Sequence, residues 1–172
     1  MQQTFLQRLD GNARRIVPFG LTLILMLFAM TPTYIPGLSH VTPMYALIAV
    51  YFWSVYRPDL LGYGAIFGIG ILEDLLAGTP LGSGALILML CQKIVLHQHK
   101  FFNAKPFAIT WLAFVLVALG ASLLRWLCVG VAGPSGFMPF GQMVTSFLMT
   151  AALFPVIAWL LAKAQMKLLA QS

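Results

Sequence analysis

Acidic residues are almost absent from this chain, and charge of either sign is scarce. Asp and Glu together number 4 among 172 residues, and charged residues make up 8% of the sequence, against about 25% in a typical soluble domain. Hydrophobic residues make up 60%, and the mean hydropathy is +0.92. The composition therefore excludes an ordinary soluble globular domain and predicts an integral membrane protein.

Cysteine is scarce as well, and so are the combinations of side chains that enzymes use for catalysis. The two cysteines, Cys91 and Cys128, lie inside apolar runs, which favours small buried side chains over a disulfide. A hydrolase or transferase needs a nucleophile with a base, a metal cluster or a phosphate-binding loop, and none is found with suitable partners. His97 and His99 have no third ligand nearby, so we interpret them as a solvated flank. We expect a protein that is not an enzyme and needs no metal or cofactor.

Long apolar runs fill most of the sequence. A helix needs about 20 apolar residues to cross a bilayer, and six such runs follow a short basic arm at residues 1–16. Because no convincing cleavage site follows the first run, we interpret it as a helix rather than a signal peptide. The predicted fold is all-α: one polytopic membrane domain over residues 1–172 with six transmembrane helices. The expected spans are residues 17–35, 41–56, 60–78, 82–99, 107–132 and 140–162.

The net charge of +6 follows from basic residues dispersed among the ends of these spans, so we expect no nucleic-acid partner. The basic residues of the N-terminal arm, the second and fourth connections and the C-terminal tail are Arg8, Arg14, Arg15, Arg57, Lys100, Lys105, Lys163 and Lys167. The first, third and fifth connections contain no lysine or arginine. By the positive-inside rule, this alternation predicts a multi-pass membrane protein with both termini in the cytoplasm.

Two adjacent acids, Glu73 and Asp74, lie within the apolar stretch 60–84. In a helix, Gly70 and Gly78 lie one turn before and one turn after Asp74, and small residues at this spacing let a second helix approach closely. We expect the same face to carry Tyr63, Phe67 and Leu81. The helix is predicted to end at Gly78-Thr79-Pro80 and the next to begin near Gly82, which makes a tight corner.

Arg125 is the one charge of the fifth span, and an unpaired charge in lipid costs at least about 2.5 kcal/mol. Its expected partner is Asp74 or Glu73, and we favour Asp74 because the two residues have similar estimated depths. Gln142 and Ser146 add a polar stripe on the sixth span, together with Thr150. Pro155 interrupts the hydrogen bonding of that span lower down. The predicted polar cluster comprises Asp74, Glu73, Arg125, Gln142 and Ser146, and its role is either structural or the binding of a partner or ligand.

Aromatic residues gather in the second span, at Tyr51, Trp53 and Tyr56. We interpret them first as an interfacial belt and only second as a ligand platform. Lys93, in the inner half of the fourth span, is expected to extend its ammonium toward the cytoplasm.

These residues resemble a known family, the rod shape-determining protein MreD of bacterial inner membranes. The resemblance is carried by Gly70-x-x-x-Asp74-Leu75-x-x-Gly78-x-x-Leu81-Gly82, preceded by Tyr51-Phe52-Trp53 and Pro58. Pro155 in the last span, the overall length and the six expected spans also fit, although the motif itself covers only residues 51–82. Glu73 is not a position that the resemblance carries over.

The resemblance implies a non-enzymatic scaffold or regulatory subunit of the complex that builds the lateral cell wall. Its implied partners are MreC and, directly or through it, MreB, RodA and a class B penicillin-binding protein, besides membrane lipid; a homo-oligomer is left open. The family is also similar in fold to the substrate-binding subunits of energy-coupling-factor vitamin transporters. The alternative function is therefore the binding of a small vitamin in the outer half of the bundle, by Asp74, Arg125, Gln142 and Ser146.

Overall fold

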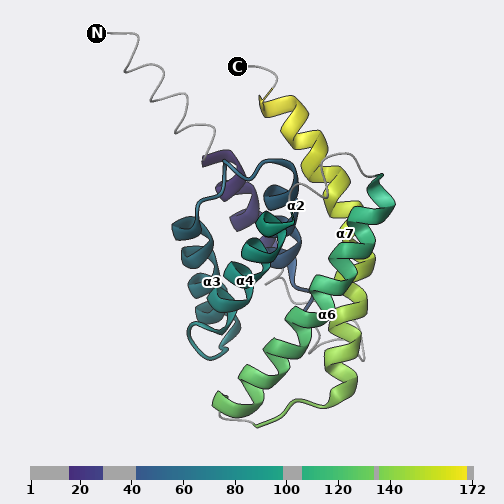
Figure 1. Ribbon diagram of the computed structural model, residues 1–172. Helices are drawn as coiled ribbons and strands as arrows, with labels where there is room; N and C mark the ends of the chain where they lie inside the picture. The colour runs from purple at the N-terminus through teal and green to yellow at the C-terminus, as the bar shows by residue number, and fades with distance from the viewer. Residues whose placement is uncertain (1–15, 29–41, 99–105, 134–135, 170–172) are drawn as a thin grey trace, which may run out of the picture.

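The described part of the chain, residues 16–28, 42–98, 106–133 and 136–169 of a computed structural model, is all-helical (Figure 1). Apart from its turns it contains six helices and no strand, as predicted. They are Ile16–Phe28, α2 (Tyr45–Tyr56), α3 (Tyr63–Ala77), α4 (Ser83–His97), α6 (Phe107–Ala132) and α7 (Phe140–Leu169). The expected span 107–132 coincides with α6, whereas α7 continues beyond residue 162.

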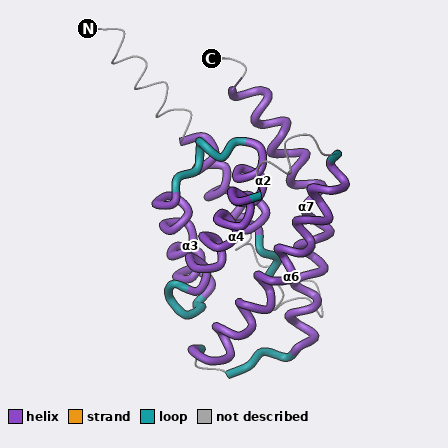
Figure 2. The backbone as a smooth tube through the Cα atoms, viewed as in Figure 1, coloured by secondary structure: helices purple, strands orange, loops and turns teal. Residues whose placement is uncertain are grey.

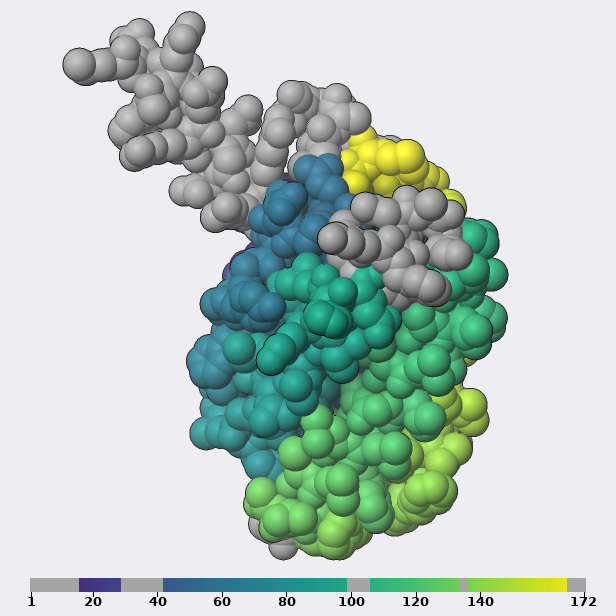
Figure 3. All heavy atoms as spheres, in the orientation of Figure 1, coloured from purple at the N-terminus to yellow at the C-terminus, as the bar shows by residue number. Residues whose placement is uncertain are grey.

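The helices form two hairpins packed around α2. α3 and α4 pack closely against each other, α6 packs against α7, and α4 also contacts α6. The α3–α4 and α6–α7 connections lie at one end of the bundle, and the α2–α3 connection lies at the other (Figure 2). The space-filling view shows the α3–α4 surface beside the α6–α7 surface (Figure 3). The two hairpins therefore turn at the same end of the molecule.

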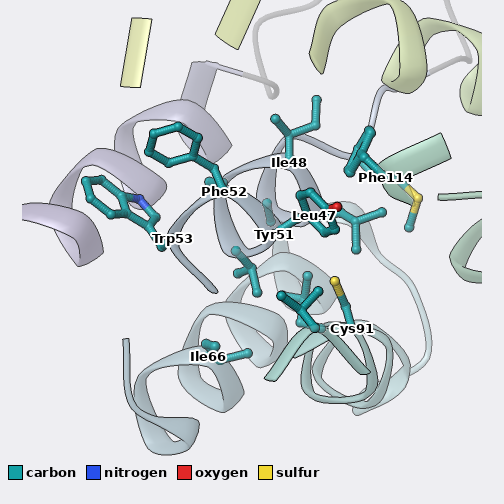
Figure 4. Packing of buried hydrophobic residues seen from close by; sticks show 14 of the residues in the cluster. Leu47, Ile48, Tyr51, Phe52, Trp53, Ile66, Cys91 and Phe114 are labelled. Atoms are coloured by element: carbon teal, nitrogen blue, oxygen red, sulfur yellow. The ribbon is translucent and has the colours of Figure 1, made fainter. Parts of the chain in front are cut away.

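α2 is the centre of the hydrophobic core. Every residue from Ala46 to Val55 is buried, so this helix is covered on all sides. Tyr51 packs edge-on against Phe114 of α6, with ring centroids 5.0 Å apart, and against Phe154 of α7 at 5.6 Å. Figure 4 shows Phe52 and Trp53 extending from α2 on the side away from Phe114. The core thus joins α2 to both long helices.

The interpretation of the α2 aromatics as an interfacial belt is wrong for two of the three. Tyr51 and Trp53 are each 0% exposed, whereas Tyr56, at the end of the helix, is 43% exposed. A helix that is apolar all round is buried on all sides in a helical bundle, and this run contains only apolar residues and Ser54 from Ala46 to Val55. The aromatic rings consequently fill the core.

Helix length separates two classes of segment. α6 has 26 residues, and it and α7 are the described helices long and apolar enough to cross a membrane. Ile16–Phe28, α2 and α4 are apolar but shorter, with α2 having 12 residues. At 1.5 Å per residue α2 is about 18 Å long, less than the roughly 30 Å of a hydrocarbon core. Two described helices thus meet the length and composition that crossing a membrane requires, and the six-span arrangement stays a prediction.

Candidate functional site

The carboxylate of Asp74 lies at the centre of the corner between α3 and α4. It accepts hydrogen bonds from the hydroxyls of Thr79 (2.7 Å) and Ser83 (3.0 Å). It also accepts hydrogen bonds from the backbone amides of Gly82 (2.8 Å) and Gly84 (2.9 Å to Oδ1 and 3.0 Å to Oδ2). Asp74 is only 2% exposed. A buried carboxylate is therefore satisfied without a cation.

This arrangement caps α4 from a neighbouring helix. The first amides of a helix have no partner within the helix, and the positive end of the helix dipole attracts an anion. Gly82, the N-cap residue of α4, has no side chain to fill this role, so Asp74 of α3 supplies the acceptor. Asp74 thereby fixes the angle between the two helices, and its oxygens are already engaged.

Four glycines and a proline shape the corner, each for its own reason. Gly70 packs directly on the backbone of Ala85, and a Cβ there would overlap it; a Cβ on Gly84 would lie 2.8 Å from Asp74 Oδ1. Gly78 and Gly82 have φ of +66° and +95°, which favour glycine. The carbonyl of Pro80 accepts the Ser83 amide at 3.1 Å. The predicted corner is confirmed.

Part of the predicted face of α3 is wrong. Gly70 and Asp74 do face α4, whereas a Cβ on Gly78 would contact nothing, so that residue is a turn position and not a packing position. Tyr63 is 47% exposed and Phe67 50% exposed, and Leu81, beyond the end of α3, is 67% exposed. The buried apolar residues of α3 are Ile66 and Ile69, because the face turned toward the bundle is rotated away from Tyr63 and Phe67.

The partner of Arg125 is Glu73, and the favoured pairing with Asp74 is wrong. Arg125 Nη1 lies 3.2 Å from Glu73 Oε1, with 22% and 12% of the two side chains exposed. Adjacent residues point about 100° apart around a helix axis. Because Asp74 turns toward α4, Glu73 turns toward α6 and reaches Arg125. The ion pair links the α3–α4 hairpin to α6.

Arg125 also lines a small cavity with the polar residues of α7. The cavity has a volume of about 70 Å³, and Arg125, Gln142, Ser146 and Ser122 contribute its polar lining. Asp74 is not among its residues, so the structure brings together three of the four residues expected to converge. A space of this size holds a few water molecules, whereas sites for small organic molecules are about 300–1,000 Å³.

The polar stripe on α7 anchors the start of α2. Ser146 donates to the carbonyl of Thr42 at 2.8 Å, and Thr150 accepts the amide of Met44 at 3.0 Å. Met44 is the N-cap residue of α2, whose first amides lack partners within the helix. The stripe therefore serves as a cap for the central helix.

A family comparison decides the identity of the chain. The model of the rod shape-determining protein MreD family matches residues 13–164. The chain belongs to the MreD family. This is a family of shape-determining proteins and not a known enzyme family.

A second comparison finds a protein with a similar sequence. An uncharacterized protein of Rickettsia prowazekii (strain Madrid E) is 27% identical over 108 residues, which cover 62% of this chain and 61% of the relative. The aligned region thus spans about three fifths of that protein. No solved structure matches the chain.

In this MreD chain, Pro155 creates a hydrogen-bonding gap that another helix fills. Proline has no amide hydrogen, so the carbonyl four residues earlier, at Ala151, lacks its usual partner in α7. The indole nitrogen of Trp111 in α6 donates to that carbonyl at 3.0 Å. Sequence reasoning identified Pro155 and missed Trp111. The signal was available, because a proline inside a membrane helix requires a donor from elsewhere.

Two further buried polar groups of the MreD chain were also missed. The Tyr51 hydroxyl donates to the carbonyl of Thr110 at 2.9 Å, and Gln92 Nε2 donates to the carbonyl of Leu61 at 2.8 Å. Both bonds connect helices to chain segments distant in sequence. Lys93, next to Gln92, is exposed, and the direction of its ammonium relative to the membrane stays a prediction.

The remaining expectations concern cysteine and metal. Cys91 and Cys128 are both free; Cys91 is buried as expected, whereas Cys128 is only partly buried. The described residues hold no group of three potential metal ligands, and His99 lies outside them.

Proposed function

We propose that this MreD-family chain is a non-enzymatic scaffold or regulatory subunit of the bacterial cell-wall elongation complex. The observation that carries the proposal is the family match over residues 13–164, which includes nearly all the described helices. Rod shape determination is the role that the family implies. The finer proposal is a multi-pass protein of the cytoplasmic membrane, with six spans and both termini in the cytoplasm.

The hydrogen bonds and the ion pair that the polar residues form support a structural role for the chain. Asp74 caps α4, Glu73 holds Arg125, and Ser146 and Thr150 anchor the start of α2. Each of these side chains connects helices of the bundle, and such connections favour a rigid scaffold. Large apolar side chains of α6 and α7 face outward, where lipid or the helices of a partner can contact them. Our proposed partners are MreC first, then MreB, RodA and a class B penicillin-binding protein, directly or through MreC.

The vitamin-binding alternative has no support from the cavity. The space that Arg125, Gln142 and Ser146 share is about 70 Å³, and Asp74 lies elsewhere, bonded to the α4 amides. A vitamin would need several times that volume. We therefore do not carry the alternative further.

Two experiments on the full chain test the proposal. In a rod-shaped bacterium depleted of its own MreD, expression of this chain should restore rod shape. Extraction of native membranes with a mild detergent should recover MreC and wall-synthesis proteins with it. Recovery of an ATPase pair and a membrane coupling subunit instead would contradict the proposal, as would failure to restore rod shape despite normal membrane levels.

A further inference from the structure

A long groove runs along the C-terminal half of α7, and we call it the α7 groove. Phe52 and Tyr56 at the end of α2, Phe107 at the start of α6, and Ala158, Trp159 and Ala162 of α7 line it. Its volume is about 500 Å³, roughly seven times that of the cavity beside Arg125. The small side chains of Ala158 and Ala162, one helical turn apart, make room for it.

The length of the α7 groove matches one leaflet of a bilayer. Its lining on α7 extends from Pro155 to Met166. The eleven steps between these two residues, at 1.5 Å each, give about 16 Å, and half of a roughly 30 Å hydrocarbon core is about 15 Å. An acyl chain could therefore lie in the groove along its whole depth.

One end of the α7 groove is polar, because Gln165 lines it and Lys163, outside the lining itself, lies against the groove residue Trp159. Lys163 Nζ lies 4.6 Å from the ring centroid of Trp159, which is a wall of the groove and is 58% exposed. Gln165 lines the same end, toward the C-terminal end of α7, whereas the lining toward Pro155 is apolar. A cation and an amide above an apolar channel complement a phosphate above an acyl chain.

We propose that the α7 groove binds one anionic phospholipid from the leaflet on the side of the α7 C-terminus. The acyl chain lies between α2, α6 and α7, and the phosphate lies beside Lys163. A whole helix, about 10 Å across, would occupy more than the groove provides over this length, so a single flexible chain fits better. The site is independent of the proposed role in wall elongation.

Native mass spectrometry of the full chain tests the site. Protein in detergent is mixed with equal amounts of phosphatidylglycerol and phosphatidylcholine, and wild type should retain phosphatidylglycerol preferentially. Lys163→Gln should lower retention of phosphatidylglycerol about fivefold, the factor that corresponds to about 1 kcal/mol for a basic residue at an anionic surface. The control Lys93→Gln, an exposed lysine on α4, should leave it unchanged. Equal losses from the two variants would overturn the proposal.

A second test of the proposal fills the α7 groove with a larger side chain. Ala162→Leu should reduce phosphatidylglycerol retention, whereas Ala152→Leu, at an exposed position of the same helix, should not. If Ala162→Leu releases a co-purified protein and leaves lipid retention unchanged, the groove is a protein interface and the proposal is wrong.

A third measurement uses the wild type, so its result does not depend on whether these variants fold. Brominated phosphatidylglycerol, as the minor lipid in phosphatidylcholine nanodiscs, should quench the fluorescence of wild type more than its share of the lipid predicts. Trp159→Phe should lose that excess. Quenching in proportion to bulk lipid content would overturn the proposal.

Discussion

Asp74 is held by four donors from a single short corner, two hydroxyls and two backbone amides. Asp74→Asn keeps the shape but replaces a carboxylate oxygen with a donor that faces other donors. We expect the free energy of unfolding to fall by about 1–3 kcal/mol, the cost of a buried group left unsatisfied. Thermal unfolding in detergent measures this, with Asp59→Asn, at an exposed position of the α2–α3 connection, as the control. Equal stability of the two variants would contradict the capping role.

Glu73 and Arg125 should be energetically coupled, because the two partly buried side chains form an ion pair at 3.2 Å. Glu73→Gln and Arg125→Gln should each destabilise the protein, and the double variant should cost less than the sum by about 1 kcal/mol, within the range for residues in contact. Thermal unfolding of the wild type, the two single variants and the double variant measures this coupling energy. The cycle of Asp74→Asn with Arg125→Gln serves as the comparison and should be closer to additive. A larger coupling for Asp74 would reverse the assignment of partners.

At the scale of the helix pair, Gly70 sets how closely α3 and α4 approach. Gly70→Ala should separate the helices, because its Cβ would overlap the backbone of Ala85. Gly68→Ala on the same helix is the matched control, since a Cβ there meets nothing within 4 Å. We expect the first change to lower the yield of monodisperse protein in detergent, and the second to be neutral or stabilising by up to about 1 kcal/mol. Equal effects would show that the close contact is not needed.

The proline of α7 and the tryptophan of α6 should act as a unit. Trp111→Phe removes the donor to the Ala151 carbonyl and should destabilise the protein by about 1–2 kcal/mol. In a Pro155→Ala background, the alanine amide can bond to that carbonyl, so the same change should cost less. Unfolding midpoints of the four proteins would show the difference. An identical cost in both backgrounds would mean that the indole contributes through packing alone.

The sequence was sufficient to predict the helices but not their rotation about their axes. Apolar runs and Gly-Pro breaks mark most helix ends: the predicted 107–132 coincides with α6, whereas α7 runs past the predicted end at 162 to Leu169. Which of Glu73 and Asp74 reaches Arg125 depends on how α3 is turned against α4, and the backbone contact at Gly70 sets this. The burial of Tyr51 and Trp53 follows from helices distant in sequence enclosing α2. Local patterns do not contain that information.

At the scale of the whole molecule, the α2–α3 connection and the C-terminal end of α7 lie at one end of the bundle, and the α3–α4 and α6–α7 connections lie at the other (Figures 1 and 2). Because Arg57 follows α2 and Lys163 lies near the end of α7, we expect the first end to be cytoplasmic. A reporter active only outside the cytoplasm should be silent when fused at Ser172 and active when inserted between α6 and α7. Activity at Ser172 would contradict the six-span proposal.

The burial of α2 has a consequence for the order in which the protein is made. The ribosome releases α2 early, but part of what encloses it, including Phe114 and Phe154, comes from α6 and α7. The hydroxyl that caps its start, on Thr150, is also translated late. The nascent chain must therefore keep this short helix incompletely covered, packed on α3 and α4 but not on α7, until synthesis is nearly finished. Any product that stops before α7 lacks Phe154 and Thr150, and so leaves one side and the first turn of this helix without their contacts.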